Sequence, residues 1–138
     1  MKTEMTPATT PTGESGGEFT QRFSATRRGA RLARLLAVRQ LHDWGVVAVD
    51  AVELVVAELV SNAVTHGLVQ GRDFELRLAL AADHVRVEVS DARGEREPAP
   101  NPRPDEHGYG LLLVTALASG WGVCGREVGK TVWATVPR

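Results

Sequence analysis

The chain has 138 residues, of which 43% are hydrophobic, and a formal net charge of −1. This length and composition fit one domain with a substantial core, and the nearly neutral charge excludes a strong field that would attract nucleic acid or an acidic membrane surface. Its apolar stretches are too short for a membrane span of ~20 residues. Residues 1–17 lack the apolar segment of a secretory signal, and Cys124 is the only cysteine, which excludes an internal disulfide. We therefore expect a cytoplasmic protein that contacts neither nucleic acid nor membrane directly.

The N-terminal part of the chain divides into a tail and the start of a folded domain. Residues 1–17 are rich in Thr, Pro, Gly and Ser and contain little to bury, which predicts a disordered tail. The folded domain is expected at 18–138. It begins with residues 18–25, where two phenylalanines in an extended-looking segment predict a strand.

Two helices are expected next. Ala, Leu and Arg dominate residues 27–44 and favour a helix, and Gly45 is typical of the residue at which a helix ends. Asp50 followed by Glu53 resembles a capping box. This pair predicts the start of a second helix, which runs to about His66.

A hairpin and a long loop follow the helices. Apolar residues alternate with polar or small ones over residues 74–80 and again over 85–89, with a turn at 81–84, which predicts an antiparallel hairpin. In residues 93–107, four prolines stand at every second position. This segment predicts a loop, because proline breaks helices and cannot donate to a strand ladder.

The C-terminal third completes the expected fold. A helix is predicted from Leu111 to about Ser119, and closing strands are predicted at residues 123–124 and 131–136 around a turn at 125–129. This order of elements predicts an α/β (α+β) two-layer sandwich. Its sheet is expected to be mixed but mostly antiparallel, with the helices on one face.

Glu58 and Asn62 are the first candidate functional residues. On a helix that turns by about 100° per residue, the valines and leucines of the second helix form the core face. Glu58 and Asn62 lie one turn apart on another side. A carboxylate beside a carboxamide can hold Mg²⁺ together with water, because hard cations prefer oxygen ligands. The alternative is a solvated polar stripe, which these two residues alone do not exclude.

Two further candidates lie at the ends of the long loop. Asp91 ends the strand before the loop, where a carboxylate can accept a hydrogen bond from an adenine amino group, although a turn-starting Asp is the alternative. After the loop comes Gly108-Tyr109-Gly110-Leu111. Glycines let the backbone approach phosphates, and a helix N-terminus offers free N–H groups with partial positive charge. The alternative is an ordinary hinge between loop and helix.

Four motifs occur in the order seen in the GHKL ATPases, the superfamily that includes gyrase, histidine kinases and heat-shock chaperones. The resemblance covers about residues 18 to 136 and is greatest to the small single-domain branch of bacterial anti-sigma-factor serine/threonine kinases and related actinobacterial ATP-binding regulators. Four spaced motifs are more specific than any one of them. They are Glu58-Leu59-Val60-Ser61-Asn62-Ala63-Val64-Thr65-His66-Gly67, then Asp91 after a strand, then Gly108-Tyr109-Gly110-Leu111, and finally Gly129-Lys130-Thr131.

The resemblance implies a Bergerat ATP-binding fold, with ATP and Mg²⁺ as ligands. Asn62 matches the family's magnesium-binding asparagine, and Glu58 matches its usual catalytic carboxylate. Asp91 matches the aspartate that binds the adenine.

The resemblance also assigns roles to the residues that follow Asp91. Residues 93–107 would form the ATP lid, and Thr131 matches the threonine that supports the adenine end. The glycine box at the phosphates would consist of Gly108, Tyr109, Gly110 and Leu111.

The first glycine box departs from the family pattern. It usually reads Asp-x-Gly-x-Gly, whereas this chain has Asp91-Ala92-Arg93-Gly94-Glu95. Gly94, which lies between the two family glycine positions, remains a candidate nucleotide-binding residue. Because Arg93 and Glu95 replace both family glycines, the backbone at the base of the lid is less flexible. We therefore expect weaker nucleotide binding than the family pattern implies, and a larger effect on turnover than on binding.

The resemblance implies an anti-sigma factor that sequesters a sigma factor and phosphorylates a serine or threonine of a small anti-anti-sigma (antagonist) protein. Kinases of this type are often homodimers. The alternative is a non-catalytic protein-binding switch of the same fold, with weak or structural nucleotide binding. A third interpretation is contact with DNA phosphates through four arginines of the first helix, but the nearly neutral chain favours a solvated or partner-facing surface. These arginines are Arg27, Arg28, Arg31 and Arg34.

Overall fold

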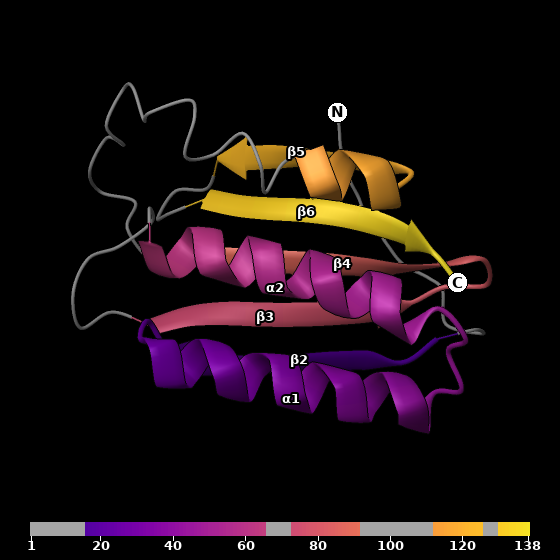
Figure 1. Cartoon of the computed structure of the whole chain (residues 1–138), viewed down its shortest axis with the longest axis horizontal. Coiled ribbons are helices and arrows are strands. Elements are labelled where there is room, and N and C mark those ends of the chain that lie inside the picture. The colour runs from indigo at the N-terminus through magenta and orange to yellow at the C-terminus, as the bar shows by residue number, and fades with distance from the viewer. Residues whose placement is uncertain (1–15, 66–72, 92–111, 126–129) are drawn as a thin grey trace.

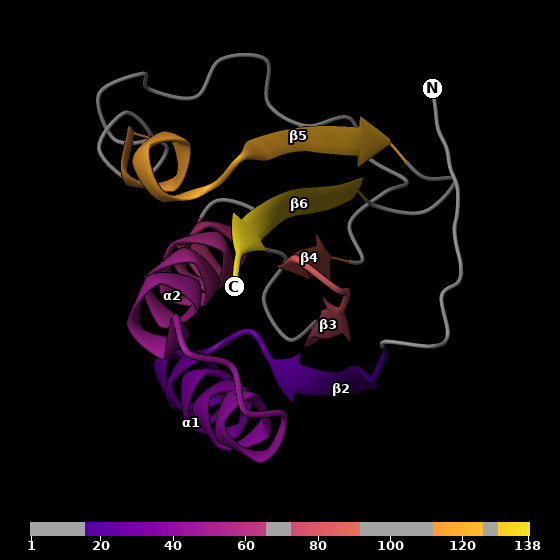
Figure 2. The same ribbon diagram turned by 90° about the vertical axis from the view of Figure 1, so that its right-hand side faces the viewer.

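The computed structural model describes residues 16–65, 73–91, 112–125 and 130–138. They form a five-stranded sheet, in the order β2-β3-β4-β6-β5, with two long helices on one face (Figures 1 and 2). The predicted α/β sandwich is confirmed, and every strand pair of this sheet is antiparallel. The elements are β2 (Glu18–Ser24), α1 (Arg27–Asp43), α2 (Val49–Thr65), β3 (Asp73–Leu80), β4 (His84–Asp91), β5 (Gly120–Gly125) and β6 (Lys130–Pro137).

Helix α1 is closed at both ends by local hydrogen bonds. Its N-cap is Thr26, whose side-chain oxygen accepts a hydrogen bond from a backbone N–H of the first turn. At the other end, Gly45 has a φ of +72°. The Gly45 N–H donates to the His42 carbonyl and the Val46 N–H to the Leu41 carbonyl, both at 3.0 Å. This pair of bonds is a Schellman motif, so the prediction that the helix ends at Gly45 is confirmed.

Helix α2 begins earlier than the sequence predicts. The Ala48 carbonyl accepts a hydrogen bond from the Val52 N–H at 3.2 Å, so Asp50 lies inside the first turn. The predicted capping box of Asp50 and Glu53 is therefore wrong. The Glu53 carboxylate pairs instead with Arg34 of α1, at 3.2 Å. Asp50 still favours this helix end, since a negative charge interacts well with the positive end of the helix dipole.

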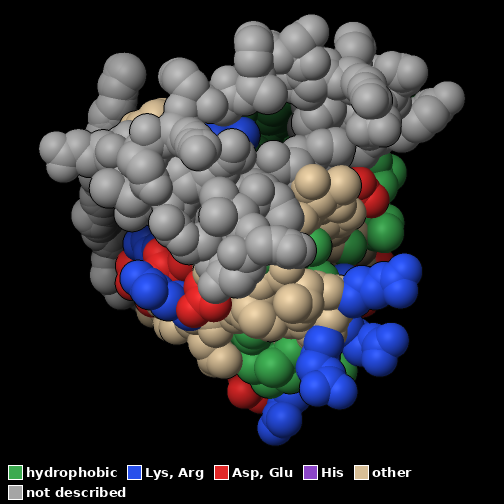
Figure 3. All heavy atoms as spheres, turned by 90° about the vertical axis from the view of Figure 1, so that its left-hand side faces the viewer, with side chains coloured by type: hydrophobic (Ala, Val, Ile, Leu, Met, Phe, Trp, Pro, Cys, Tyr) green, Lys and Arg blue, Asp and Glu red, His purple; other side chains and the backbone are tan. Residues whose placement is uncertain are grey.

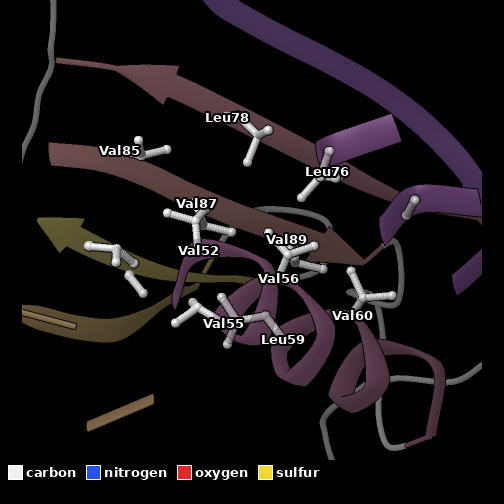
Figure 4. Packing of buried hydrophobic residues seen from close by; sticks show 14 of the residues in the cluster. Val52, Val55, Val56, Leu59, Val60, Leu76, Leu78, Val85, Val87 and Val89 are labelled. Carbon is white, nitrogen blue, oxygen red and sulfur yellow. The ribbon is translucent and has the colours of Figure 1, made fainter. Parts of the chain in front are cut away.

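The core lies between the sheet and the helices. Alternate residues of β3 and β4 are buried and pack against the buried face of α2 (Figure 4). Full burial of one such side chain contributes roughly 1.5–3 kcal/mol, so this layer holds the helices on the sheet. The predicted hairpin is confirmed. Its buried residues are Phe74, Leu76, Leu78, Val85, Val87 and Val89, opposite Val52, Val55, Val56, Leu59 and Val60.

The C-terminal third has a shorter described helix and longer strands than the sequence predicts. Residues 112–117 are helical, within the predicted span of 111–119. Strand β5 begins at Gly120 rather than at residue 123. Trp121 explains this difference, because it packs against the core and its indole N–H donates to the Thr115 hydroxyl at 2.9 Å. Among the described residues, no helix has the length and apolar character needed to cross a membrane.

Candidate functional site

The end of α2, the end of β4 and the start of β6 lie at the same edge of the sandwich (Figure 1, left). Helix α2 packs on both strands. Strand β4 runs toward this edge and ends at Asp91, whereas β6 begins there at Lys130. Near this edge, the buried Val60 of α2 and the buried Val89 of β4 lie in the same part of the core (Figure 4). The fold therefore brings the candidate residues of the helix and of the strand to one place.

Glu58 and Asn62 lie one turn apart on α2, as their spacing predicts. Both are half-buried. In the part of the chain that the structure describes, neither side chain makes a hydrogen bond or an ion pair. The described residues also contain no group of three or more His, Cys, Asp or Glu side chains that could hold a metal ion. Among the described residues at this end, Glu58 and Asn62 offer side-chain oxygens to a cation such as Mg²⁺, which commonly completes its shell with water and phosphate oxygens.

Asp91 lies on the helix-facing side of the sheet. It follows Val89 by two residues in an unbroken antiparallel register, and successive side chains of a strand point to opposite faces. Its cross-strand neighbours are Phe74 of β3, which is buried, and Lys130 of β6. The half-buried Asp91 carboxylate thus lies between an aromatic side chain and a cation. It can accept a hydrogen bond from an amino group on a flat, largely apolar ring.

Strand β6 presents Lys130, and not Thr131, to this side of the sheet. Lys130 shares the face of the buried Val136, because the difference between their positions in the strand is even. The Thr131 hydroxyl lies on the opposite face, 2.7 Å from the hydroxyl of Ser90. The assignment of Thr131 to the adenine end stays a prediction, with Ser90 as its link to the strand that carries Asp91. Sequence reasoning missed Lys130, although the two-residue period of the strand could have found it.

Several predicted parts of the site lie outside the described residues. These parts are the segment proposed as the lid, residues 93–107, and both glycine boxes beyond Asp91. The end of α2 after Thr65, the turn at 126–129 and most of the N-terminal tail lie outside as well. Their roles stay predictions from the sequence. The candidate residues concerned are Gly94, Gly108, Tyr109, Gly110 and Leu111.

The comparison with family models decides the family. The model of the histidine kinase-like ATPase domain matches residues 23–136. The chain belongs to this family. The match begins inside β2 and ends inside β6, so it includes all or part of every described helix and strand. A comparison with curated proteins gives no match.

A histidine kinase-like ATPase domain is an ATP-binding domain, and the described residues place several polar side chains at one end of the sandwich. Asp91 offers a carboxylate acceptor at the end of β4, next to the buried Phe74. One helix away, Glu58 and Asn62 offer side-chain oxygens that the described part of the protein does not use. The arrangement therefore suits a ligand with a flat base at one end and a metal-bound phosphate chain at the other.

Proposed function

We propose that the protein binds Mg-ATP and acts as an anti-sigma factor that phosphorylates a serine or threonine of a small antagonist protein. One observation carries this proposal. The half-buried Glu58 and Asn62 side chains have no partner among the described residues and lie on the helix that packs beside Asp91. The family match supports the ATP-binding part, and the resemblance of the motifs supports the regulatory part.

Each residue of the site has one role in this proposal. The Asn62 oxygen holds Mg²⁺, which supplies charge neutralisation at the phosphates. Asp91 holds the base. Glu58 accepts the proton of the attacking serine or threonine hydroxyl, whose oxygen forms a bond to the γ-phosphorus while ADP leaves. General-base catalysis of this kind contributes roughly 10²–10⁴-fold in rate.

The outer surface of α1 supports a protein partner rather than DNA. Five exposed arginines lie on this helix, and blue side chains gather over it at the lower right of Figure 3. Two leucines among them are also exposed, Leu32 at 44% and Leu35 at 57%. Apolar side chains next to cations suit an acidic protein surface better than a phosphate backbone, because DNA contacts are dominated by charged and polar groups. A sigma factor and its antagonist are the partners that we propose, with a homodimer as the assembly.

A non-catalytic switch of the same fold is the second candidate function. It is favoured by Arg93 and Glu95, which replace the two glycines of the first glycine box. In that case the chain would bind its partner and ATP without transferring phosphate.

Calorimetric titration tests the binding part of the proposal. The wild type should bind ATP in the presence of Mg²⁺, and Asn62→Ala should lose this binding while its thermal unfolding changes little, because Asn62 is not part of the core. Ser61→Ala is the matched control, since Ser61 is an exposed neighbour on the same helix. Unchanged affinity of Asn62→Ala would remove the metal role of this residue.

Labelled ATP separates the two candidate functions. Wild-type protein incubated with candidate antagonist proteins should transfer label to one of them. Glu58→Gln should keep ATP binding and lose transfer, because the amide preserves size and polarity but cannot accept the proton. If the wild type binds partner and ATP yet transfers no label, the kinase proposal fails and the switch stands.

A further inference from the structure

Lys130 has no role in the reaction proposed above, yet β6 places it directly opposite Asp91. The side chains of opposite residues in an antiparallel pair lie on the same face, with Cβ atoms roughly 4.5–5.5 Å apart. Lys130 is half-buried, as is Asp91. Lys130 and Asp91 therefore start from neighbouring positions on the helix-facing side of the sheet, at the end of the sandwich where α2 ends.

A hydrogen bond on the other face supports this orientation of Lys130. The hydroxyls of Ser90 and Thr131 belong to the residue pair next to Asp91 and Lys130, and they are 2.7 Å apart on the open face. A slip of β6 by one residue would break this bond. It would also turn the buried Val136 away from the core, because a one-residue slip moves every side chain to the other face. The packing and the hydrogen bond thus hold Lys130 on the side of Asp91.

We propose that Lys130 is a specificity-determining residue for the nucleobase, an inference that rests on the proposed ATP site. In adenine, the exocyclic amino group is a donor and the adjacent ring nitrogen N1 is an acceptor. Asp91 is an acceptor and Lys130 a donor, so the two side chains match this pair of atoms in order. The Lys130 ammonium donates to N1 while the Asp91 carboxylate accepts from the amino group.

The same pair disfavours guanine in that orientation. Guanine has a carbonyl oxygen in place of the amino group and an N–H at position 1. The carbonyl would meet the Asp91 carboxylate, and the N–H would meet the Lys130 ammonium, so both contacts would be repulsive. Lys130 therefore adds to the selectivity that Asp91 alone would provide, because a mismatched polar group leaves a donor or an acceptor of the site without its hydrogen bond.

The test combines one variant with one altered nucleotide. Lys130→Met keeps an unbranched side chain without the ammonium, and 1-deaza-ATP has a C–H in place of N1. Calorimetric titrations with ATP and with 1-deaza-ATP, both with Mg²⁺, are compared for the wild type and for Lys130→Met. Thermal unfolding checks that the variant is folded. Arg86→Met, which removes a cation on the opposite face of the sheet, is the matched control, and Lys130→Arg should restore the donor.

The proposal expects the wild type to bind ATP roughly tenfold more tightly than 1-deaza-ATP, the loss that follows from a hydrogen bond with a charged donor. Lys130→Met should bind the two nucleotides alike. If the wild type bound ATP and 1-deaza-ATP equally well, the role of Lys130 would be overturned while the ATP site would stand. The same would follow if Lys130→Met lost affinity equally for the two nucleotides, because the ammonium would then act only through its charge. If the wild type does not bind ATP at all, the proposed function fails and this inference fails with it.

Discussion

The two faces of the sheet are built from the same strands but are stabilised in different ways (Figure 2). The face covered by α1 and α2 is mainly apolar, and most of its side chains in β3 and β4 are buried. The other face has no described helix over it and carries charged and polar side chains. Burial of apolar area contributes far more per residue than exposed ion pairs do. The difference indicates that the covered face holds the fold together, whereas the open face tolerates change.

The open face has an ordered row of charges across three strands. Arg77 of β3 pairs with Glu18 of β2 and with Glu88 of β4, the latter at 3.3 Å. Arg86 donates to Glu88 at 2.7 Å, and its guanidinium lies 4.5 Å from the ring centroid of Trp133 on β6. Burial alone would lower the pKa of Arg77, but the carboxylates of Glu88 and Glu18 outweigh it and raise that pKa. These contacts fix the positions of the side chains on the open face, but the partly exposed ion pairs contribute little to the stability of the fold.

Leu76 and Arg77 compare the two faces most directly, because they are adjacent on β3 and point to opposite sides. Leu76→Ala should lower the free energy of unfolding by about 2–5 kcal/mol, since it leaves a cavity in the core. Arg77→Ala should cost less than about 1 kcal/mol, since it removes only partly exposed ion pairs. Urea unfolding of both variants measures the two costs. Equal costs would break the contrast between the faces.

Two glycines sharpen the same contrast at a smaller scale. A Cβ at Gly29 of α1 would lie 1.9 Å from the Ser24 carbonyl oxygen, which is backbone, whereas one at Gly122 of β5 would lie 3.0 Å from the Trp133 ring. Gly29→Ala should therefore destabilise the fold by about 1–3 kcal/mol, because the helix must move away from the strand. Gly122→Ala should change stability by no more than about 0.5 kcal/mol, since a side chain on the open face can turn aside. Thermal unfolding of the two variants would contradict this view if Gly122→Ala proved the more damaging.

Thr131→Val tests whether the open face matters for the ligand. The substitution removes the hydrogen bond to Ser90 and should cost about 1 kcal/mol of stability. The side chain lies on the opposite face from Asp91, and an unchanged nucleotide affinity would contradict the predicted role of Thr131 at the adenine end. A tenfold weaker titration with Mg-ATP would show that Thr131 acts on the adenine through Ser90, as the motif match alone predicts.

The smallest expected effect concerns the hairpin turn at the other end of β4. The hydrogen bond from His84 at 2.8 Å lowers the pKa of Asp83 below its usual value. A carboxyl group with a lower pKa in the folded state adds stability above its unfolded pKa, and this is lost as the pH falls through the folded value. Stability should therefore decrease slightly below about pH 4, and less so in Asp83→Asn. The effect is small because Asp83 is exposed and screened by salt. If the stability of the wild type and that of Asp83→Asn changed equally with pH, the Asp83–His84 pair would have no role in the pH dependence.

Local patterns in the sequence determined most of the fold. The alternation of residues in β3 and β4 needs only the two-residue period of a strand, and the end of α1 needs only a glycine where φ is positive. The four-residue spacing of Glu58 and Asn62 puts both on one side of any helix. The order of four motifs was enough to identify the family that the family model confirms. These features depend on neighbours in the chain, and the sequence lists those neighbours directly.

Only the tertiary structure decided where α2 begins and which residue of β6 lies opposite Asp91. Glu53 contacts Arg34 of another helix instead of its own helix end, and no local pattern records such a contact. The motif match assigns Thr131 to the adenine end, and the register of β6 against β4 adds that Lys130 lies opposite Asp91. That register is set by core packing and cross-strand bonds between residues about 40 positions apart. A one-residue difference within a motif is invisible in the sequence but reverses the face of a strand.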